Sequence, residues 1–408
     1  MASKFSPSVV IFIITSCLFT IVSFSLVSYI AATDLIRFDV RAFYTGAVMA
    51  AHNVTTGFYD PTVQYTWQKQ FFAIPDQTYL LPFVYPSFVA LPISVIASLP
   101  IELFYKVVAI ADIFLLLWTF FILLRTLKLF SDPVQTGIAC LLFFSFLPLW
   151  ESVMQIQLTP ILFFAFIVAW AAQKKHHNFL AGVALSLLLV RPHLIIVPVI
   201  VLIYKQQWRT LAGIGAGGII LLFLFAWTTG IASVFTYLHV LLNYQSLAGM
   251  YDQPHLEATL KGFLHAITHT RDLGHILPAY IFLSGGILIL LLRSLKGTIN
   301  TTKPSFDIQW SLIIVTTILT SPHTLFHDVL LLMLPILILV QRLVGYLSKR
   351  SVMQWKLWCV IYGVFFFELL SGIFRSYPVM LVPLILSIFG LLMWQLRQEQ
   401  ARQSLHAV

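Results

Sequence analysis

Residues 8–32 read SVVIFIITSCLFTIVSFSLVSYIAA and contain no charged side chain. A helix of this length crosses the roughly 30 Å hydrocarbon core of a bilayer. Similar apolar runs recur to the end of the chain, whose 408 residues are 59% hydrophobic and only 10% charged. A soluble domain cannot bury so much apolar surface. The sequence therefore predicts an all-α polytopic membrane protein in which residues 1–408 form a single integral membrane domain.

The apolar runs together predict about 12 transmembrane helices. The predicted spans are residues 8–31, 102–124, 132–150, 157–173, 178–190, 192–204, 210–236, 277–294, 309–321, 327–343, 352–371 and 378–396. The stretch 83–99 is also apolar, but Pro82, Pro86, Pro92 and Pro100 lie in or beside it. Proline interrupts a helix, so we expect an interfacial or re-entrant segment there and not a full crossing.

The basic residues are dispersed along the chain, so the formal net charge of +9 indicates membrane topology and not nucleic-acid binding. Most of the 24 lysines and arginines fall on one side of the predicted spans, which the positive-inside rule makes the cytoplasmic side. Both termini are then cytoplasmic, with a first external loop at residues 32–101 and a second external region at 237–276. The aromatic-rich stretches 39–53 and 59–72 of the first loop predict interfacial helices.

Two predicted hairpins are unusually short. Residues 178–190 pair with 192–204, and 309–321 pair with 327–343. A helix of about 13 residues is only about 20 Å long, less than the hydrocarbon thickness of about 30 Å. We therefore expect the polar tips RPHL and SPHTLFHD near the outer part of the membrane, on the same side as Asp39.

Asp39 follows the first span and has two interpretations. A carboxylate beside an apolar surface has a pKa raised toward neutrality, which suits a general base. An aspartate directly before a helix is also a favoured N-cap. Spacing alone favours the cap.

The hairpin tips carry the other ionisable candidates. Arg191 suits recognition of a phosphate, or else it extends to the outer interface as an anchor. His323 and His327 share one face if they are helical, but the ligand set is incomplete, so we expect no metal. A histidine that donates to a phosphate, or that caps the hairpin, fits better. Gln155 and Gln157 suit sugar hydroxyls, although a water-facing loop is the simpler interpretation.

Seven motifs follow one another over about residues 32–345, and their order is more specific than any one of them. They are FDVRAFYTGAVMA, GFYDP, PFVYPSFVALPISVIASLP, MQIQLTPILFFAFIVAWAAQKK, FLAGVALSLLLVRPHLIIVPVIVLIYKQQWR, NYQSLAG and SPHTLFHDVLLLMLPILIL. In this succession the chain resembles the polyprenyl-phosphate-mannose-dependent α-mannosyltransferases of glycosyltransferase family 87, which share the GT-C membrane fold. Two departures are Met154-Gln155-Ile156-Gln157 in place of Gly-Gln-x-Asn, and the lack of an arginine after NYQSLAG.

The resemblance implies a sugar transfer, with mannose the expected sugar, from a polyprenyl-phosphate donor to a lipid or glycan acceptor. The expected place is the external face of a bacterial inner (plasma) membrane. The lipid-linked sugar is a substrate, so no cofactor is expected. The resemblance makes Asp39 the catalytic base of an inverting displacement and assigns the donor phosphate to Arg191, His193 and His323. Further candidates for substrate binding are Tyr44, Gln155, Gln157, His327 and Asp328. The competing class is a polytopic transporter or lipid flippase, since broken hairpins with polar tips also occur there.

Overall fold

The structure, a computed structural model, describes residues 6–33, 35, 39–77, 80–242, 256–269, 273–295, 301, 303–347 and 378–405. Within these ranges all regular elements are helices, as predicted, and there are no strands. The α-helices are α1 (Pro7–Thr33), α2 (Val40–Ala51), α3 (Pro61–Phe71), α4 (Ala90–Ser94), α5 (Ile101–Thr126), α6 (Pro133–Ser145), α7 (Leu147–Met154), α8 (Thr159–Lys174), α9 (Asn178–Ser186), α10 (Ile196–Tyr204), α11 (Trp208–Thr229), α12 (Ile231–Leu242), α14 (Leu260–Thr268), α15 (Leu273–Ser294), α16 (Pro304–Thr320), α17 (Met333–Leu347) and α19 (Val382–Leu405). Short 3-10 helices are η3 (Ser87–Val89), η4 (Leu129–Ser131), η5 (Leu187–Val190), η6 (Pro192–Ile195), η8 (Phe326–Leu332) and η10 (Pro378–Leu381).

Five of the described helices are long and apolar enough to cross a membrane, namely α1, α5, α11, α15 and the segment Pro378–Ala401. Their outer faces expose large apolar side chains, such as Trp227 in α11 (73% exposed) and Phe282 in α15 (79%). Such surface is stable against lipid and not against water. The chain is therefore an integral membrane protein. The count of 12 spans stays a prediction, since α8, α9, α10 and α12 are shorter and residues 352–371 lie outside the described ranges.

The predicted span 132–150 is not one straight helix, because the chain bends there by 48° between α6 and α7. Pro148 has no N–H to continue the helix toward the carbonyl of Phe144. The indole of Trp150 donates to that carbonyl instead, at 2.7 Å. The broken pair counts as a sixth span only if both helices are taken together.

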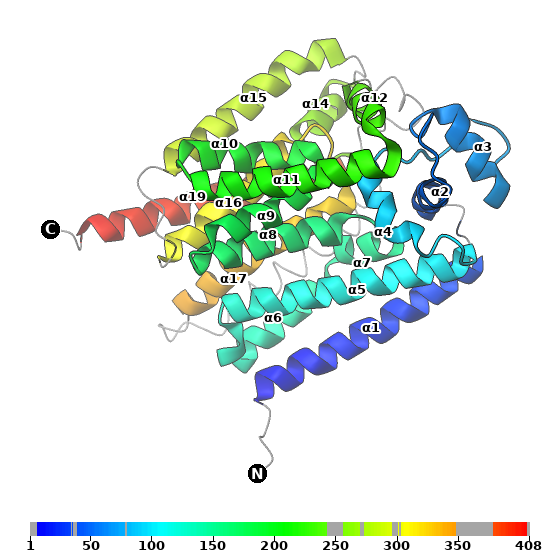
Figure 1. The fold of residues 1–408 in the computed structure, drawn as a ribbon. Coiled ribbons are helices and arrows are strands. Elements are labelled where there is room, and N and C mark those ends of the chain that lie inside the picture. The colour runs from blue at the N-terminus through cyan, green and yellow to red at the C-terminus, as the bar shows by residue number, and fades with distance from the viewer. Residues whose placement is uncertain are drawn as a thin grey trace.

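The predicted span 210–236 is also interrupted. Helix α11 ends at Thr229, and Gly230 adopts φ +85°, which favours glycine. Helix α12 then turns away from the axis of α11 (Figure 1). Hydropathy did not predict this break, because apolar residues continue on both sides of the glycine.

Helices α2, α3 and α4 lie together at one end of the bundle, beside the end of α1 (Figure 1). The two helices predicted in the first external loop are present as α2 and α3. Helix α2 buries nearly all its side chains within the protein, and its position relative to the membrane surface stays a prediction. The stretch 83–99 forms only η3, α4 and turns, in agreement with the prediction that it is not a full span.

Two glutamines of α3 hold the extended segment that follows it. Gln64 bonds to the backbone of Phe83 in both directions, accepting from its N–H at 2.7 Å and donating to its carbonyl at 3.1 Å. Gln68 does the same for Leu81, at 3.0 and 2.9 Å. The side-chain amides thus replace a neighbouring strand. This pairing positions the residues that lead to Tyr85, whose carbonyl accepts from the hydroxyl of Tyr59 at 3.0 Å.

The predicted short hairpin is confirmed as α9 with η5, followed by η6 with α10. Helix α9 packs closely on α11 through glycines on both helices. A Cβ added to Gly213 would lie 2.1 Å from the carbonyl oxygen of Phe179, and one added to Gly182 would lie 1.9 Å from that of Thr210. The contact is therefore backbone against backbone, as in membrane helices joined by small residues.

This packing predicts opposite results for the same substitution at two neighbouring glycines. Gly213→Ala should lower the free energy of unfolding by at least about 1–3 kcal/mol, because the rigid backbone of α9 cannot give way. Gly215→Ala, where nothing lies within 4 Å of the added atom, should be neutral or stabilising by about 0.5–1 kcal/mol. Thermal unfolding of the detergent-solubilised variants measures both changes. Equal effects at the two positions would contradict the close contact.

Candidate functional site

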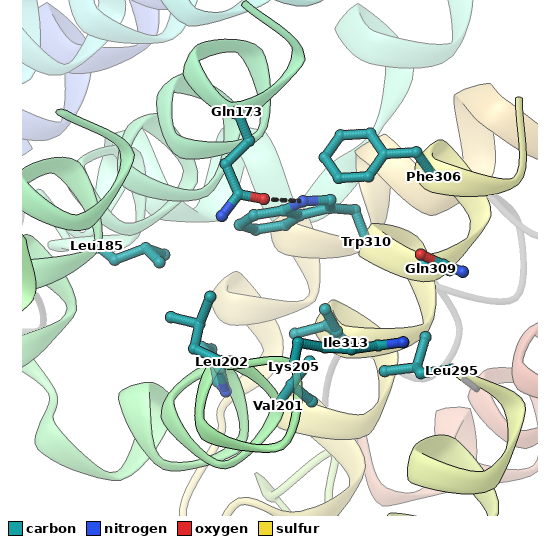
Figure 2. A pocket seen from close by; sticks show the side chains of 11 residues that line it. Gln173, Leu185, Val201, Leu202, Lys205, Leu295, Phe306, Gln309, Trp310 and Ile313 are labelled. Atoms are coloured by element: carbon teal, nitrogen blue, oxygen red, sulfur yellow. Dashed lines mark hydrogen bonds between the residues drawn. The ribbon is translucent and has the colours of Figure 1, made fainter. Parts of the chain in front are cut away.

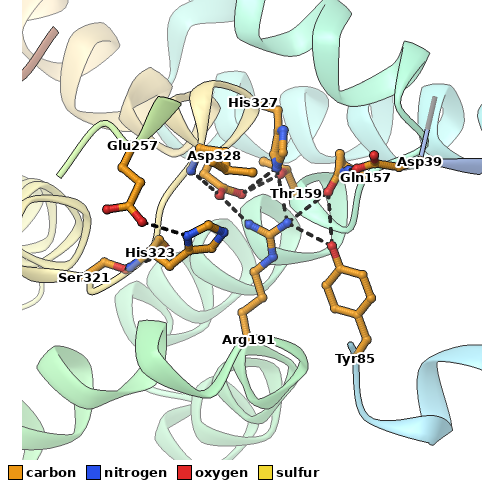
Figure 3. Close-up of polar contacts among 11 residues, drawn as sticks. Asp39, Tyr85, Gln157, Thr159, Arg191, Glu257, Ser321, His323, His327 and Asp328 are labelled. Carbon is orange, nitrogen blue, oxygen red and sulfur yellow. Dashed lines mark hydrogen bonds and ion pairs between the residues drawn. The ribbon is translucent and has the colours of Figure 1, made fainter. Parts of the chain in front are cut away.

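Arg191 is the centre of a polar cluster at the tip of the first hairpin (Figure 3). Its Nη1 donates to Asp328. Its Nη2 donates to Gln157 Oε1 at 2.9 Å, to the hydroxyl of Tyr85 at 3.3 Å and to His327 Nε2 at 3.2 Å. Only 7% of the side chain is exposed. The interpretation of Arg191 as an anchor at the outer interface is therefore wrong, since the guanidinium lies inside the protein.

Asp328 is the carboxylate that neutralises Arg191. It lies in η8, and its side chain is fully buried. Besides Arg191, it accepts from the hydroxyl of Thr159 at 2.8 Å and from the backbone N–H of Leu325 at 3.0 Å. A buried ion pair is stable only when its remaining hydrogen-bonding groups are satisfied in this way.

Asp39 joins the same cluster through Gln157. The Nε2 of Gln157 donates to Asp39 Oδ2, while its Oε1 accepts from Arg191. The backbone N–H of Asp39 donates to Gln155 Oε1 at 3.2 Å. Asp39 precedes α2 but makes no side-chain cap bond, so the N-cap interpretation is wrong. Gln157 is 2% exposed, which also excludes the water-facing loop proposed for it.

The environment of Asp39 shifts its acidity. Burial raises the pKa of this carboxyl to about 6, against the opposing effects of Arg191 and the hydrogen bond from Gln157. The carboxylate of Glu151 adds to the increase, and Arg41 opposes it. A carboxylate with a pKa near 6 is mostly ionised at neutral pH and is a stronger base than an ordinary aspartate.

A second ionic group lies beside the first. Nδ1 of His323 donates to Glu257 Oε1 at 3.0 Å, and Nζ of Lys261 lies 2.9 Å from the same oxygen (Figure 3 shows His323 and Glu257). Burial tends to raise the pKa of Glu257, but the hydrogen bond from His323 and the charges of His323 and Lys261 leave it below its ordinary value. Glu257 therefore carries a negative charge in the folded protein.

The remaining predicted residues lie as follows. Tyr44 donates to the carbonyl of Leu99 at 3.2 Å and packs among aromatic rings, so the structure gives no contact between it and the cluster. His193 Nε2 is buried and has no hydrogen-bond partner among the described residues. His327 lies in η8 while His323 precedes that helix, so the expected shared helix face is wrong. The NYQSLAG motif lies outside the described ranges.

Sequence reasoning missed four residues of the site, namely Tyr85, Thr159, Glu257 and Lys261. Tyr85 precedes Pro86, and proline favours an extended residue before it, which was the available signal. Thr159 follows Gln157 by two residues and begins α8. Glu257 had no local signal, because its partner His323 is far away along the chain. Among the described residues no group of three or more His, Cys, Asp or Glu side chains is arranged to hold a metal ion.

A cavity near the other end of the hairpin has a different character (Figure 2). It lies between α8, α10 and α16, and its walls are mainly apolar. The indole of Trp310 donates to Gln173 Oε1 at 3.1 Å, so these two lining groups satisfy each other. This cavity therefore offers far less polar chemistry than the cluster around Arg191.

A model of glycosyltransferase family 87 matches residues 83–322, which is more than half of the chain. The matched range contains Tyr85, Gln157, Arg191 and Glu257, while Asp39 precedes it. No curated protein and no solved structure gives a significant match.

The buried ion pair predicts a large loss of stability when one partner is removed. Arg191→Met should cost about 3–5 kcal/mol in free energy of unfolding, because the Asp328 carboxylate is left buried without a cation. Arg191→Met with Asp328→Leu should recover part of this loss. The control is Lys174→Met, whose partner Asp307 is 16% exposed and whose loss should be smaller. Thermal unfolding in detergent compares them, and equal losses for Arg191→Met and Lys174→Met would refute the argument.

Proposed function

The chain belongs to glycosyltransferase family 87, and we propose that this membrane glycosyltransferase uses a polyprenyl-phosphate sugar, with mannose as the sugar. The acceptor in this proposal is a lipid or glycan at the external face of the membrane. Family membership favours a transferase over a transporter or lipid flippase. The polyprenyl-phosphate donor rests on the succession of motifs along the chain.

One observation carries the mechanism. The side-chain amide of Gln157 donates to Asp39 and accepts from Arg191, so this one amide bridges a carboxylate and a guanidinium (Figure 3). Transfer of a sugar from a phosphate needs a base for the acceptor hydroxyl and positive charge near the leaving group. Asp39 and Arg191 supply these two functions from neighbouring positions.

The proposed reaction is a single inverting displacement at the anomeric carbon. Asp39 takes the proton of the acceptor hydroxyl while the acceptor oxygen bonds to this carbon. The bond from the carbon to the phosphate oxygen breaks, and its electron pair stays on that oxygen. One base suffices, because a phosphate leaves more readily than an alcohol and needs no second carboxylic acid of the kind used by glycosidases.

Arg191 acts in this scheme mainly through its charge. Its Nη1 and Nη2 groups already donate to protein groups, and only 7% of the side chain is exposed. A phosphate oxygen reaches Nη2 by replacing Tyr85, Gln157 or His327 there. Direct contact with the phosphate is therefore assigned to His323, 35% of whose side chain is exposed, with His193 beside it.

The proposed topology has about 12 spans, with both termini cytoplasmic and Asp39 external, in a bacterial inner (plasma) membrane. The shorter apolar helices and residues 352–371 complete this count. In support, α2 to α4 lie at the opposite end of the bundle from the basic ends of α5 and α8 (Figure 1).

The experiment incubates purified protein with radiolabelled polyprenyl phosphate mannose and a membrane lipid extract. Wild type should form a labelled lipid or glycan, and Asp39→Asn should lower turnover by about 10²–10⁴-fold, the usual contribution of a general base. The variant should fold at least as stably as wild type at pH 7, because it removes a buried charge. Turnover of wild type should fall about tenfold per pH unit below pH 6, where Asp39 becomes protonated.

Asp60→Asn is the matched control. Asp60 belongs to the same loop but is exposed and caps α3 by accepting from the N–H of Thr62 at 2.7 Å. Its substitution should change turnover by less than a few fold. Near wild-type turnover by Asp39→Asn would refute the role of Asp39, and a wild type without transfer would refute the donor.

A further inference from the structure

Glu257, Lys261 and His323 come from two segments that are tied together. Glu257 precedes α14, Lys261 lies in the first turn of that helix, and His323 follows α16. The backbone N–H of Ala258 donates to the carbonyl of Thr324 at 2.8 Å, which fixes one segment against the other. The approach of Glu257 to His323 is therefore built into the backbone and does not depend on one mobile side chain.

The three side chains differ sharply in exposure. The side chain of Glu257 is 2% exposed and that of Lys261 9%, but that of His323 is 35% exposed. A bound ligand thus reaches the imidazole and not the ion pair behind it. A buried carboxylate that orients an accessible histidine is a recurring arrangement in catalysis, because it fixes the ring and the position of its proton.

The hydrogen bond also fixes which ring nitrogen carries a proton. Glu257 is ionised, so it accepts, and Nδ1 of His323 must carry hydrogen to donate to it. The Nε2 edge of the ring is turned toward the side on which Arg191 lies (Figure 3). The hydrogen bond from His323, with the charges of His323 and Lys261, keeps Glu257 ionised, so that the carboxylate does not take the proton from the ring.

We propose that Glu257 is a positioning residue that holds His323 with its Nε2 edge toward the leaving phosphate. This inference rests on the proposed function. A sugar linked to a polyprenyl phosphate is a phosphodiester with one negative charge, and cleavage adds a second charge to the departing monoester. The imidazolium of His323 donates its Nε2 proton to that phosphate oxygen. The ring is left neutral with Nδ1–H still bonded to Glu257, while the acceptor proton goes separately to Asp39.

The alternative is that Glu257 merely ties the loop to α14. The two explanations differ in how the effects of two substitutions combine. If Glu257 acts through His323, substituting Glu257 has no further effect on turnover once the imidazole has been removed. If Glu257 only ties the loop to α14, substituting Glu257 lowers turnover by the same factor whether or not the imidazole is present.

The test is a double-mutant cycle on turnover with radiolabelled polyprenyl phosphate mannose. Glu257→Gln keeps the shape but removes the charge and should lower kcat about 10–100-fold with little change in KM, as is typical for groups that orient a reactive side chain. His323→Ala should lower kcat at least as much. The double variant should match His323→Ala alone, and added imidazole should restore part of the activity of His323→Ala but less of that of the double variant.

Losses that multiply in the double variant would overturn the inference while wild-type transfer stays intact. A wild type that transfers no mannose would overturn the proposed function and this inference with it. Thermal unfolding checks that each variant is folded. If Glu257→Gln does not fold, Glu257→Asp replaces it in the same cycle. The shorter side chain of aspartate keeps the negative charge but places the carboxylate farther from Nδ1 of His323.

Discussion

A buried guanidinium constrains everything around it. Arg191 cannot lose its proton, so the chain must supply a counter-charge and hydrogen-bond acceptors inside the protein. The counter-charge is Asp328 of η8, and the acceptors include Gln157, before α8, and Tyr85, in the segment before η3. Three segments far apart in sequence thus meet at one side chain. Through Gln157 the same network reaches Asp39, so the position of the proposed base depends on this ion pair.

The segment between α1 and α5 supports this network as a packed unit. Gln64 and Gln68 hold the backbone that leads to Tyr85, and α2 is buried on nearly all sides directly after Asp39. Reactive groups keep their geometry best when the surrounding elements are rigid. The carboxylate of Asp39 makes no cap bond to α2. It therefore accepts a hydrogen bond from Gln157 and can also accept a proton.

The sequence predicted the all-helical membrane fold and the short hairpin, because these follow from hydropathy and helix length. It failed at the bends near Pro148 and Gly230, since apolar composition continues through a backbone break. It also missed Tyr85 and Glu257, whose partners are distant in sequence and follow no helical period. The resemblance assigned a catalytic role to Asp39, and only the structure showed Gln157 between Asp39 and Arg191.

The charge balance of the cluster affects how strongly the site stabilises the transition state relative to the bound donor. Arg191 is paired with Asp328, and Lys261 is paired with Glu257. In the proposed reaction the donor phosphodiester therefore meets Arg191 and Lys261 as members of ion pairs and not as unpaired cations. The second negative charge arises only as the sugar leaves. Groups oriented toward that charge stabilise the transition state more than the bound donor, and this difference is what accelerates a reaction.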